Sequence, residues 1–179
     1  EMLVQMGSAA AALGDRTVSA NTSVSVIAAS GGFGIMMADA AEEHGLTLNR
    51  TGDAAIEQIK AVLPLASAVN PVDATAQMSA NPETFGALLS AVASDDANEV
   101  VCIMMALGLE VPRLRDTYLA ALDAVRAAHP DQVFVACVAG PDDALQILNA
   151  KGILTFPTID AMMEGVSHLG RLTAEKDKS

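Results

Sequence analysis

Short apolar runs alternate with amphipathic stretches along the chain. Four runs rich in β-branched residues predict buried parallel strands, and a fifth, weaker run follows the same pattern. They cover residues 23–30, 99–106, 132–139 and 152–157, with the weaker one at 65–73. Stretches with a 3.6-residue period predict helices at 34–45, 53–63, 82–94, 111–129, 141–152 and 161–172. This alternation indicates an α/β fold, a parallel five-stranded sheet with right-handed crossovers and helices on both faces.

Residues typical of helix ends support these limits. Asn81 and Pro82 fit an N-cap and first helical position, and Pro141 with the two following aspartates fits another first turn. Gly152 fits the position after a helix C-terminus. The Ala-rich segment Met2 to Leu13 predicts a further helix on the sheet edge.

The length of 179 residues predicts one domain, residues 1–172, followed by a charged tail, 173–179, that frays. The first residue is Glu, and no basic stretch precedes an apolar one, so we read the start neither as a signal peptide nor as a natural N-terminus. We therefore expect a piece of a larger protein. No apolar run approaches the roughly 20 residues of a spanning helix, which indicates a soluble protein.

Charge and composition exclude several function classes. Ten basic against 22 acidic residues give a net charge of −12, which would repel nucleic acid and anionic membranes. Aromatic residues make up 3% and Trp is absent, so base-stacking platforms are not expected. Cys102 and Cys137 lie in apolar runs and are predicted to be buried and reduced, which favours a cytoplasmic chain without a metal site.

A glycine-rich turn is the main candidate for chemistry. Ser30, Gly31, Gly32, Phe33 and Gly34 connect the first predicted strand to the first helix. Free N–H groups and the positive end of a helix dipole at the carboxyl edge of a sheet favour an anion, although glycines also simply permit a tight turn.

Known anion-binding motifs do not match this turn. Met37 stands where a dinucleotide motif needs its third glycine, and no Lys follows the glycines as in a kinase-type loop. A flavin sandwich would need aromatic rings, but the one tyrosine, Tyr118, is predicted in mid-helix, and the paired acids of a receiver domain are missing. The remaining candidate ligand is a phosphoryl group presented by another part of a larger protein.

The order of the motifs resembles a module of the NDP-forming acyl-CoA synthetases. The motifs are VIAASGGFGIMMADAAEEHGL, NPVDATA, PETFGALLSAVASDDANEVVCIMM and LQILNAKGILTFPTIDAMMEGVSHL. Relatives include ADP-forming acetyl-CoA synthetase and succinyl-CoA synthetase, whose β subunit ends in an equivalent domain. The resemblance extends roughly from Val18 to Leu169 and implies a three-layer, flavodoxin-like (Rossmann-like) fold.

In that family ATP phosphorylates a histidine, the phosphoryl group passes to a carboxylic acid, and CoA displaces it to form the thioester. The resemblance implies that the turn Ser30 to Gly34 stabilises the phosphohistidine, with Phe33 in place of the usual small residue or proline. The phosphohistidine belongs to another module, because His44, His129 and His168 are predicted at helix ends or late in a helix. No catalytic residue is therefore expected in this chain, which alone should be inactive.

The same resemblance suggests a substrate cleft made of Asn70, Asp73, Ala106, Leu107 and Gly108. For Asp73 we favour a loop-shaping role. Leu109 and Glu110 replace a more glycine-rich, basic loop, which disfavours succinate-like diacids and favours a monocarboxylic acid. For the nearby Arg113 and Arg115, surface ion pairs are the expected role.

The implied partners are CoA-binding, phosphohistidine and ATP-grasp domains, in the same polypeptide or in a partner subunit of a homo- or hetero-oligomer. The whole protein would use ATP, Mg²⁺ and CoA, whereas this domain alone would bind no cofactor. The alternative is a catalytically silent, ligand-sensing domain of a multidomain protein such as a protein lysine acetyltransferase. A generic small-ligand domain is the third possibility.

Met36, Met37, Met162 and Met163 are predicted mainly as core residues, with some left for a surface that other modules cover.

Overall fold

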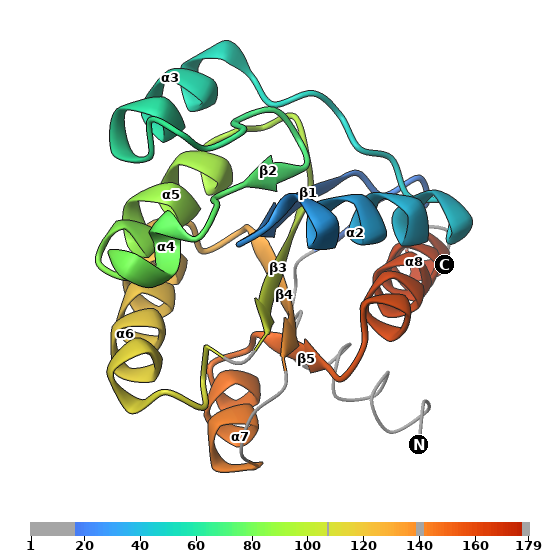
Figure 1. The fold of residues 1–179 in the computed structure, drawn as a ribbon. Coiled ribbons are helices and arrows are strands. Elements are labelled where there is room, and N and C mark those ends of the chain that lie inside the picture. Colours follow the sequence, from blue (N-terminus) through green and yellow to red (C-terminus); the bar gives the residue numbers. More distant parts are fainter. Residues whose placement is uncertain (1–16, 107, 139–141, 177–179) are drawn as a thin grey trace.

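The computed structural model describes residues 17–106, 108–138 and 142–176, and the predicted helix Met2 to Leu13 lies outside these ranges. Strands and helices alternate along the chain (Figure 1). The elements are β1 (Val24–Ala28), α2 (Gly31–Glu43), α3 (Asp53–Val62), β2 (Val72–Asp73), α4 (Gln77–Ala80), α5 (Thr84–Ala93), β3 (Val100–Ala106), α6 (Pro112–Ala128), β4 (Val133–Val138), α7 (Asp142–Ala150), β5 (Leu154–Phe156) and α8 (Ile159–Lys176).

The five strands form one parallel sheet in the order β2-β1-β3-β4-β5. This flavodoxin-like arrangement confirms the predicted fold class. β3 lies at the centre and pairs with β1 on one side and β4 on the other. The strand order reverses between β1 and β3, and ligands of open α/β folds bind beside the carboxyl ends of strands at such a point.

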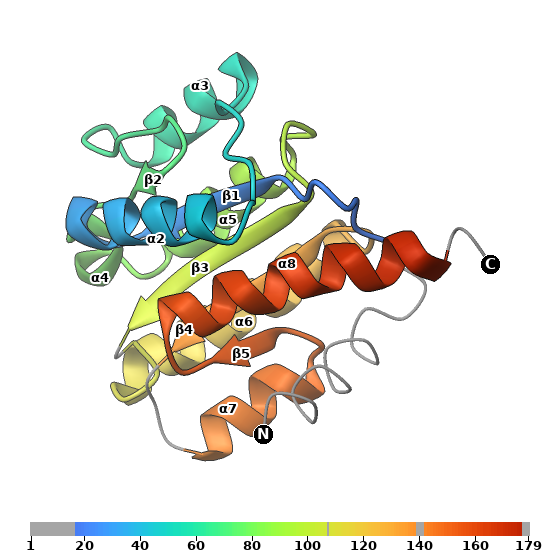
Figure 2. The same ribbon diagram turned by 90° about the vertical axis from the view of Figure 1, so that its right-hand side faces the viewer.

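Helices cover both faces of the sheet. Figure 2 shows α2 and α8 on the near face, and α5 and α6 lie behind the strands. Alternate β3 side chains pack against the helices on the two faces of the sheet, because successive side chains of a strand point to opposite faces. Val101 and Ile103 pack with α5 and α6, whereas Val100 and Cys102 pack with α2 and α8. Cys102 and Cys137 are buried in strands and free, as predicted.

The weak strand predicted over 65–73 is wrong for most of its length. Only Val72 and Asp73 form β2, and the preceding residues make an irregular loop with one antiparallel bridge, Ser67 to Asp73. Pro71 has no N–H group for a strand ladder. The Asn70 side chain bonds β1 instead: its Oδ1 accepts from the Val26 N–H at 2.9 Å and its Nδ2 donates to the Val24 carbonyl at 2.8 Å.

The start of the helix predicted over 82–94 is also displaced. Asn81 and Pro82 form a turn ahead of α5, with the Thr84 N–H donating to the Asn81 carbonyl at 3.0 Å. The short helix α4 before this turn has no counterpart among the predictions. Gly152 does follow a helix, with φ +70°, as expected. The last helix continues to Lys176, and Thr173 is buried, with its hydroxyl donating to the Val18 carbonyl.

Glu99 ties the amino-terminal side of the sheet together. Its carboxylate accepts hydrogen bonds from the Ser19 N–H at 2.8 Å, the Ser19 hydroxyl at 2.7 Å and the Ser23 N–H at 3.1 Å. Burial by itself would raise the pKa of the Glu99 carboxyl, but these bonds to Ser19 and Ser23 outweigh it and lower the pKa. The charged form is therefore favoured in the folded chain.

Candidate functional site

The glycine turn forms the first turn of α2. Ser30 is the N-cap, in an extended conformation, and its side chain makes no capping hydrogen bond. Gly34 is the first residue of the helix whose N–H makes a backbone hydrogen bond; it donates to the Ser30 carbonyl at 3.2 Å. Within the described part of the chain, the N–H groups of Gly31, Gly32 and Phe33 have no hydrogen-bond acceptor. These donors and the helix dipole make a positive site at the carboxyl edge of the sheet.

The three glycines of the turn have different surroundings. A β-carbon on Gly34 would lie 3.3 Å from the Pro71 β-carbon, and one on Gly31 would lie 3.2 Å from Asp73 Oδ2. Close neighbours therefore disfavour a side chain at these two positions. A β-carbon on Gly32 would meet no atom within 4 Å, and Gly32 does not have a positive φ. Neither packing nor backbone conformation within the described residues requires a glycine at position 32.

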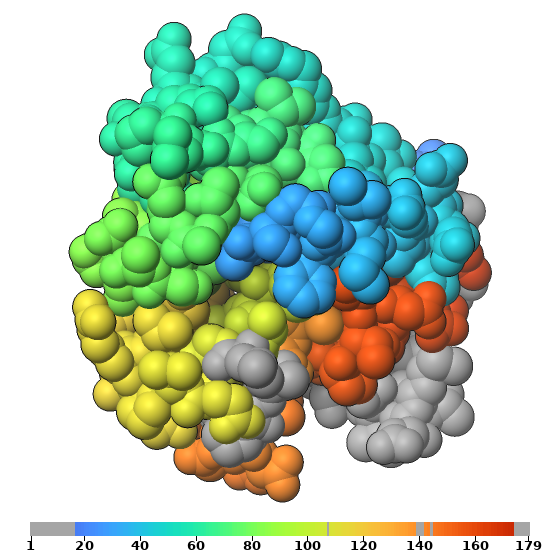
Figure 3. Space-filling view, viewed as in Figure 1, coloured from blue at the N-terminus to red at the C-terminus, as the bar shows by residue number. Residues whose placement is uncertain are grey.

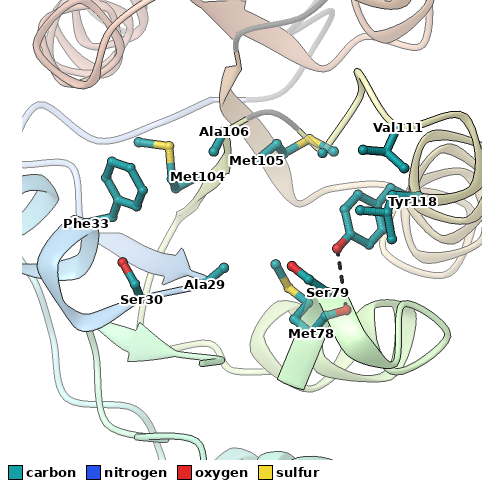
Figure 4. Close-up of a pocket in the computed structure, with 12 residues that line it drawn as sticks. Ala29, Ser30, Phe33, Met78, Ser79, Met104, Met105, Ala106, Val111 and Tyr118 are labelled. Atoms are coloured by element: carbon teal, nitrogen blue, oxygen red, sulfur yellow. Dashed lines mark hydrogen bonds between the residues drawn. The ribbon is translucent and has the colours of Figure 1, made fainter. Parts of the chain in front are cut away.

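A cavity of about 480 Å³ opens beside this turn (Figure 4). It lies where β1 and β3 end, between α2, α4 and α6. The described lining residues are Ala29, Ser30, Phe33, Met78, Ser79, Met104, Met105, Ala106, Gly108, Val111, Leu114 and Tyr118. The structure thus brings Ser30, Phe33, Ala106 and Gly108 to one cavity, as their predicted positions after β1 and β3 suggest.

Tyr118 forms one wall of the cavity and was not predicted as a site residue. Its ring packs on Phe85 with the centroids 4.6 Å apart, and its hydroxyl donates to the Met78 carbonyl at 3.5 Å. Burial raises the pKa of Tyr118, and a hydrogen bond with Ser79 opposes this in part. The periodicity of α6 marks Tyr118 only as a core position. Met78 has no sequence signal either, because its helix, α4, is a single turn.

The end of β3 is irregular where it meets the cavity. The pairing with β4 shifts register between Met104 and Ala106, and Ala106 has φ +45°. Such a left-handed conformation is unfavourable for alanine and is often found at functional sites. A β-carbon on Gly108 would lie 2.9 Å from the Tyr118 ring, so close packing requires glycine there. Leu107 lies outside the described residues.

Asn70 and Asp73 do not line the cavity. Asn70 completes the hydrogen bonds of β1, as described above. Asp73 accepts a hydrogen bond from the Thr75 N–H at 2.8 Å, which is the loop-shaping role expected of it. Its other carboxylate oxygen, Oδ2, faces Gly31 and brings a negative charge to the start of α2.

The charged and histidine side chains singled out in the sequence lie away from the cavity lining. Arg115 pairs with Asp143 at 3.7 Å, and His44, which follows α2, pairs with Asp160 at 2.8 Å. His129 follows α6, and His168 lies within α8. In the described ranges there is no cluster of three or more His, Cys, Asp or Glu side chains able to hold a metal ion. No helix in those ranges is both long and apolar enough to cross a bilayer.

The sequence matches no protein-family model and no curated protein. Solved structures, however, share the fold. PH0766 from Pyrococcus horikoshii OT3 superposes with a TM-score of 0.74 at 20% identity, over 94% of this chain and 39% of that chain. The apo form of a dinucleotide forming acetyl-coenzyme A synthetase 1 from Ca. Korarchaeum cryptofilum gives 0.75 at 20% identity, over 98% and 40%. The same protein in complex with phosphate and ADP gives 0.73 at 19%, over 94% and 38%.

These comparisons define the class of fold. The described residues have the fold of a flavodoxin-like module, and the structures that share it include an acetyl-coenzyme A synthetase, as the motif resemblance predicts. The chain spans about 40% of the length of the synthetase chain that it matches.

Proposed function

We propose that this chain is a module of an NDP-forming acid–thiol ligase. The whole enzyme converts a carboxylic acid, CoA and ATP into acyl-CoA, ADP and phosphate by way of a phosphohistidine. In this proposal the N-terminus of α2 stabilises the phosphoryl group, whereas the histidine belongs to another module. The observation that carries the proposal is the open surrounding of Gly32 beside three N–H groups without an acceptor in the described chain.

The chemistry of these groups suits a phosphohistidine. A phosphoryl group on an imidazole carries a dianionic charge that must be stabilised without being held permanently. Backbone donors and a helix dipole provide this, with about 0.3–1 kcal/mol from the dipole in exposed positions and more where water is excluded. Since Gly32 has no side chain, the phosphoryl group and its carrier have room to approach the N–H groups closely.

The surface of α2 supports docking of another module. Phe33 is 38% exposed, Ile35 64% and Met36 56%, so three large apolar side chains of the first two turns face outward. The space-filling view shows α2, in blue, on the face that is turned to the reader (Figure 3). Met37, Met162 and Met163 are fully buried, as predicted for core residues. An apolar patch next to an anion site fits the surface that a phosphohistidine module would cover.

The remaining parts of the enzyme are assigned to other modules. We place the CoA-binding, phosphohistidine and ATP-grasp functions, with the Mg²⁺ and ATP that they use, outside this chain, in the same polypeptide or a partner subunit. This fits the 40% coverage of the acetyl-coenzyme A synthetase chain. The isolated chain is then inactive. Two free buried cysteines suit a reducing compartment, and we place the enzyme in the cytoplasm.

Nucleotide turnover by the longer protein tests this function. The assay supplies ATP and CoA with a panel of short, branched and aromatic acids and separates ADP from AMP. The proposal expects ADP only when both CoA and one of the acids are present. It also expects Gly32→Val to abolish most of this turnover, while Gly45→Ala at the other end of α2 leaves it intact. A folded longer protein that forms no acid-dependent ADP would overturn the ligase.

The alternative is a silent, ligand-sensing module, for instance in a protein lysine acetyltransferase. One observation favours it: the Asp73 carboxylate faces Gly31 and partly neutralises the positive end of α2. A fused acetyltransferase domain, together with binding of an acyl-CoA or an acid without turnover, would support this alternative. Acid-dependent ADP formation would exclude it.

A further inference from the structure

The cavity beside the glycine turn has a lining that is unusually apolar for an edge of the sheet where charged ligands bind. Three methionines, Met78, Met104 and Met105, line it together with Leu114 and Tyr118. The polar side chains among the described lining residues are the hydroxyls of Ser30, Ser79 and Tyr118, and none of those lining residues is charged. Figure 4 shows the methionines and Tyr118 around the cavity, with Ser30 and Phe33 on the side of α2.

From this lining we infer that the cavity binds the hydrocarbon part of a monocarboxylic acid with a bulky branched or aromatic chain. The inference rests on the proposed ligase function and names the substrate class. The acid would insert its apolar end between the methionines and Tyr118. Its carboxyl group would stay on the side of Ser30 and Phe33, next to the turn where the proposed function places the phosphoryl group.

The volume and polarity of the cavity disfavour other acids. A second carboxylate, as in succinate, would lose its water without gaining a charged partner, because no described lining residue is a cation. Arg115, which follows the lining residue Leu114, is paired with Asp143 and does not line the cavity. Acetate would fill only a small part of about 480 Å³ and would leave most of the apolar wall without contact.

The side chains present are suited to a bulky apolar group. Methionine is flexible and polarizable, and it adapts its shape to different apolar ligands, including aromatic rings. The Tyr118 ring is held by Phe85 and offers an aromatic surface for a second ring to pack against.

Binding can be measured on this chain without any turnover. Methionine methyl groups labelled with ¹³C are observed by NMR while phenylacetate, acetate or succinate is added. Phenylacetate should shift the methyl signals of Met78, Met104 and Met105. The signals of Met37 and Met163, which are fully buried and do not line the cavity, serve as internal controls and should not move. Absence of a shift with phenylacetate, or larger shifts with succinate, would overturn the inference.

A cavity-filling variant tests specificity in the longer protein. Ser79 is exposed and lines the cavity, so Ser79→Phe should occupy the space of the substrate chain, with the loss of one hydrogen bond to Tyr118. We expect kcat/KM for phenylacetate to fall by at least about tenfold, while that for acetate changes little. Leu172→Phe, at an exposed apolar position on α8, is the matched control and should change neither.

The two proposals fail in different ways. If no acid supports ADP formation, the ligase function fails, and the NMR titration still decides whether the cavity accepts apolar acids. If ADP forms with succinate or acetate at a higher kcat/KM than with phenylacetate, the ligase function stands and the substrate class is wrong. Equal loss of turnover with all acids in Ser79→Phe would likewise contradict the assigned cavity.

Discussion

The two ends of α2 differ in how they are capped. At the C-terminus, Gly45 has φ +73°, its N–H donates to the Glu42 carbonyl at 3.0 Å, and the Leu46 N–H donates to the Ala41 carbonyl at 2.9 Å. This is a Schellman motif, completed by burial of Leu46. At the N-terminus the Ser30 side chain makes no capping bond, and three N–H groups lack an acceptor in the described chain.

One end of the helix is therefore completed by residues of this chain, and the other end is not. The closed end needs only local residues, and its glycine is explained by its own backbone conformation. The open end lies beside the cavity, and its Gly32 is not explained by any neighbour in the described ranges. An open helix end next to a cavity is what a group supplied from outside the chain would need.

The largest expected effect separates function from stability at the open end. In the longer protein, Gly32→Val should lower acid-dependent ADP formation by roughly 10²-fold, because the new side chain keeps the phosphoryl group away from the N–H groups, and losing one such donor costs about this much. The free energy of unfolding of this chain should change by less than about 0.5 kcal/mol, because position 32 is exposed and a β-carbon there meets no atom within 4 Å. Turnover is measured by ADP release and stability by urea unfolding. A loss of both turnover and stability would show that Gly32 has a structural role, as Gly45 does at the other end of α2.

A second prediction concerns the carboxylate that holds the amino-terminal side of the sheet. The folded state lowers the pKa of Glu99, so its contribution to stability is present above the unfolded pKa and is lost as the pH falls through the folded value. Glu99→Gln should lower the unfolding free energy at neutral pH by about 1–2 kcal/mol and should flatten its acid dependence. Urea unfolding between neutral pH and the acid range measures both. An unchanged acid slope in Glu99→Gln would rule out Glu99 as its source.

The closed end of α2 should respond in stability alone. Gly45→Ala forces an alanine into a left-handed conformation and should cost about 1–2 kcal/mol of unfolding free energy. Gly45→Asn is the matched control, because asparagine tolerates this conformation better, and its loss should be smaller. ADP formation by the folded longer protein should stay at the wild-type rate in both variants. A large drop in turnover would show that the closed end also serves the site.

The smallest effect is expected for Asp73, which both shapes its own loop and places a negative charge beside the N-terminus of α2. Asp73→Asn keeps an oxygen for the Thr75 N–H but removes the negative charge that faces Gly31. The N-terminus of α2 should then bind inorganic phosphate a few-fold more tightly, in line with helix-dipole effects of about 0.3–1 kcal/mol. Amide NMR shifts of Gly31, Gly32 and Phe33 during a phosphate titration measure this change. Weaker binding in the variant would mean that Asp73 supports the anion site.

Much of the fold follows from local patterns. The apolar runs that became β1, β3, β4 and β5 are short, β-branched and bounded by glycine, proline or aspartate, so their positions are visible in the sequence. The strand predicted over 65–73 is too long because the run is apolar enough for a strand, yet Pro71 has no N–H group to join the ladder. Asn70, expected in the cleft, uses its side chain to replace the missing backbone partners of β1.

The order of strands and helices, the parallel sheet and the glycine turn at the start of α2 are all predictable from the sequence, because periodicity and glycine positions are local properties of the chain. Which side chains surround the cavity follows only from the packing of distant elements, since Met78, Met105 and Tyr118 belong to α4, β3 and α6. Only the structure also distinguishes Gly32 from Gly31 and Gly34, because the need for a glycine depends on which distant atoms approach it.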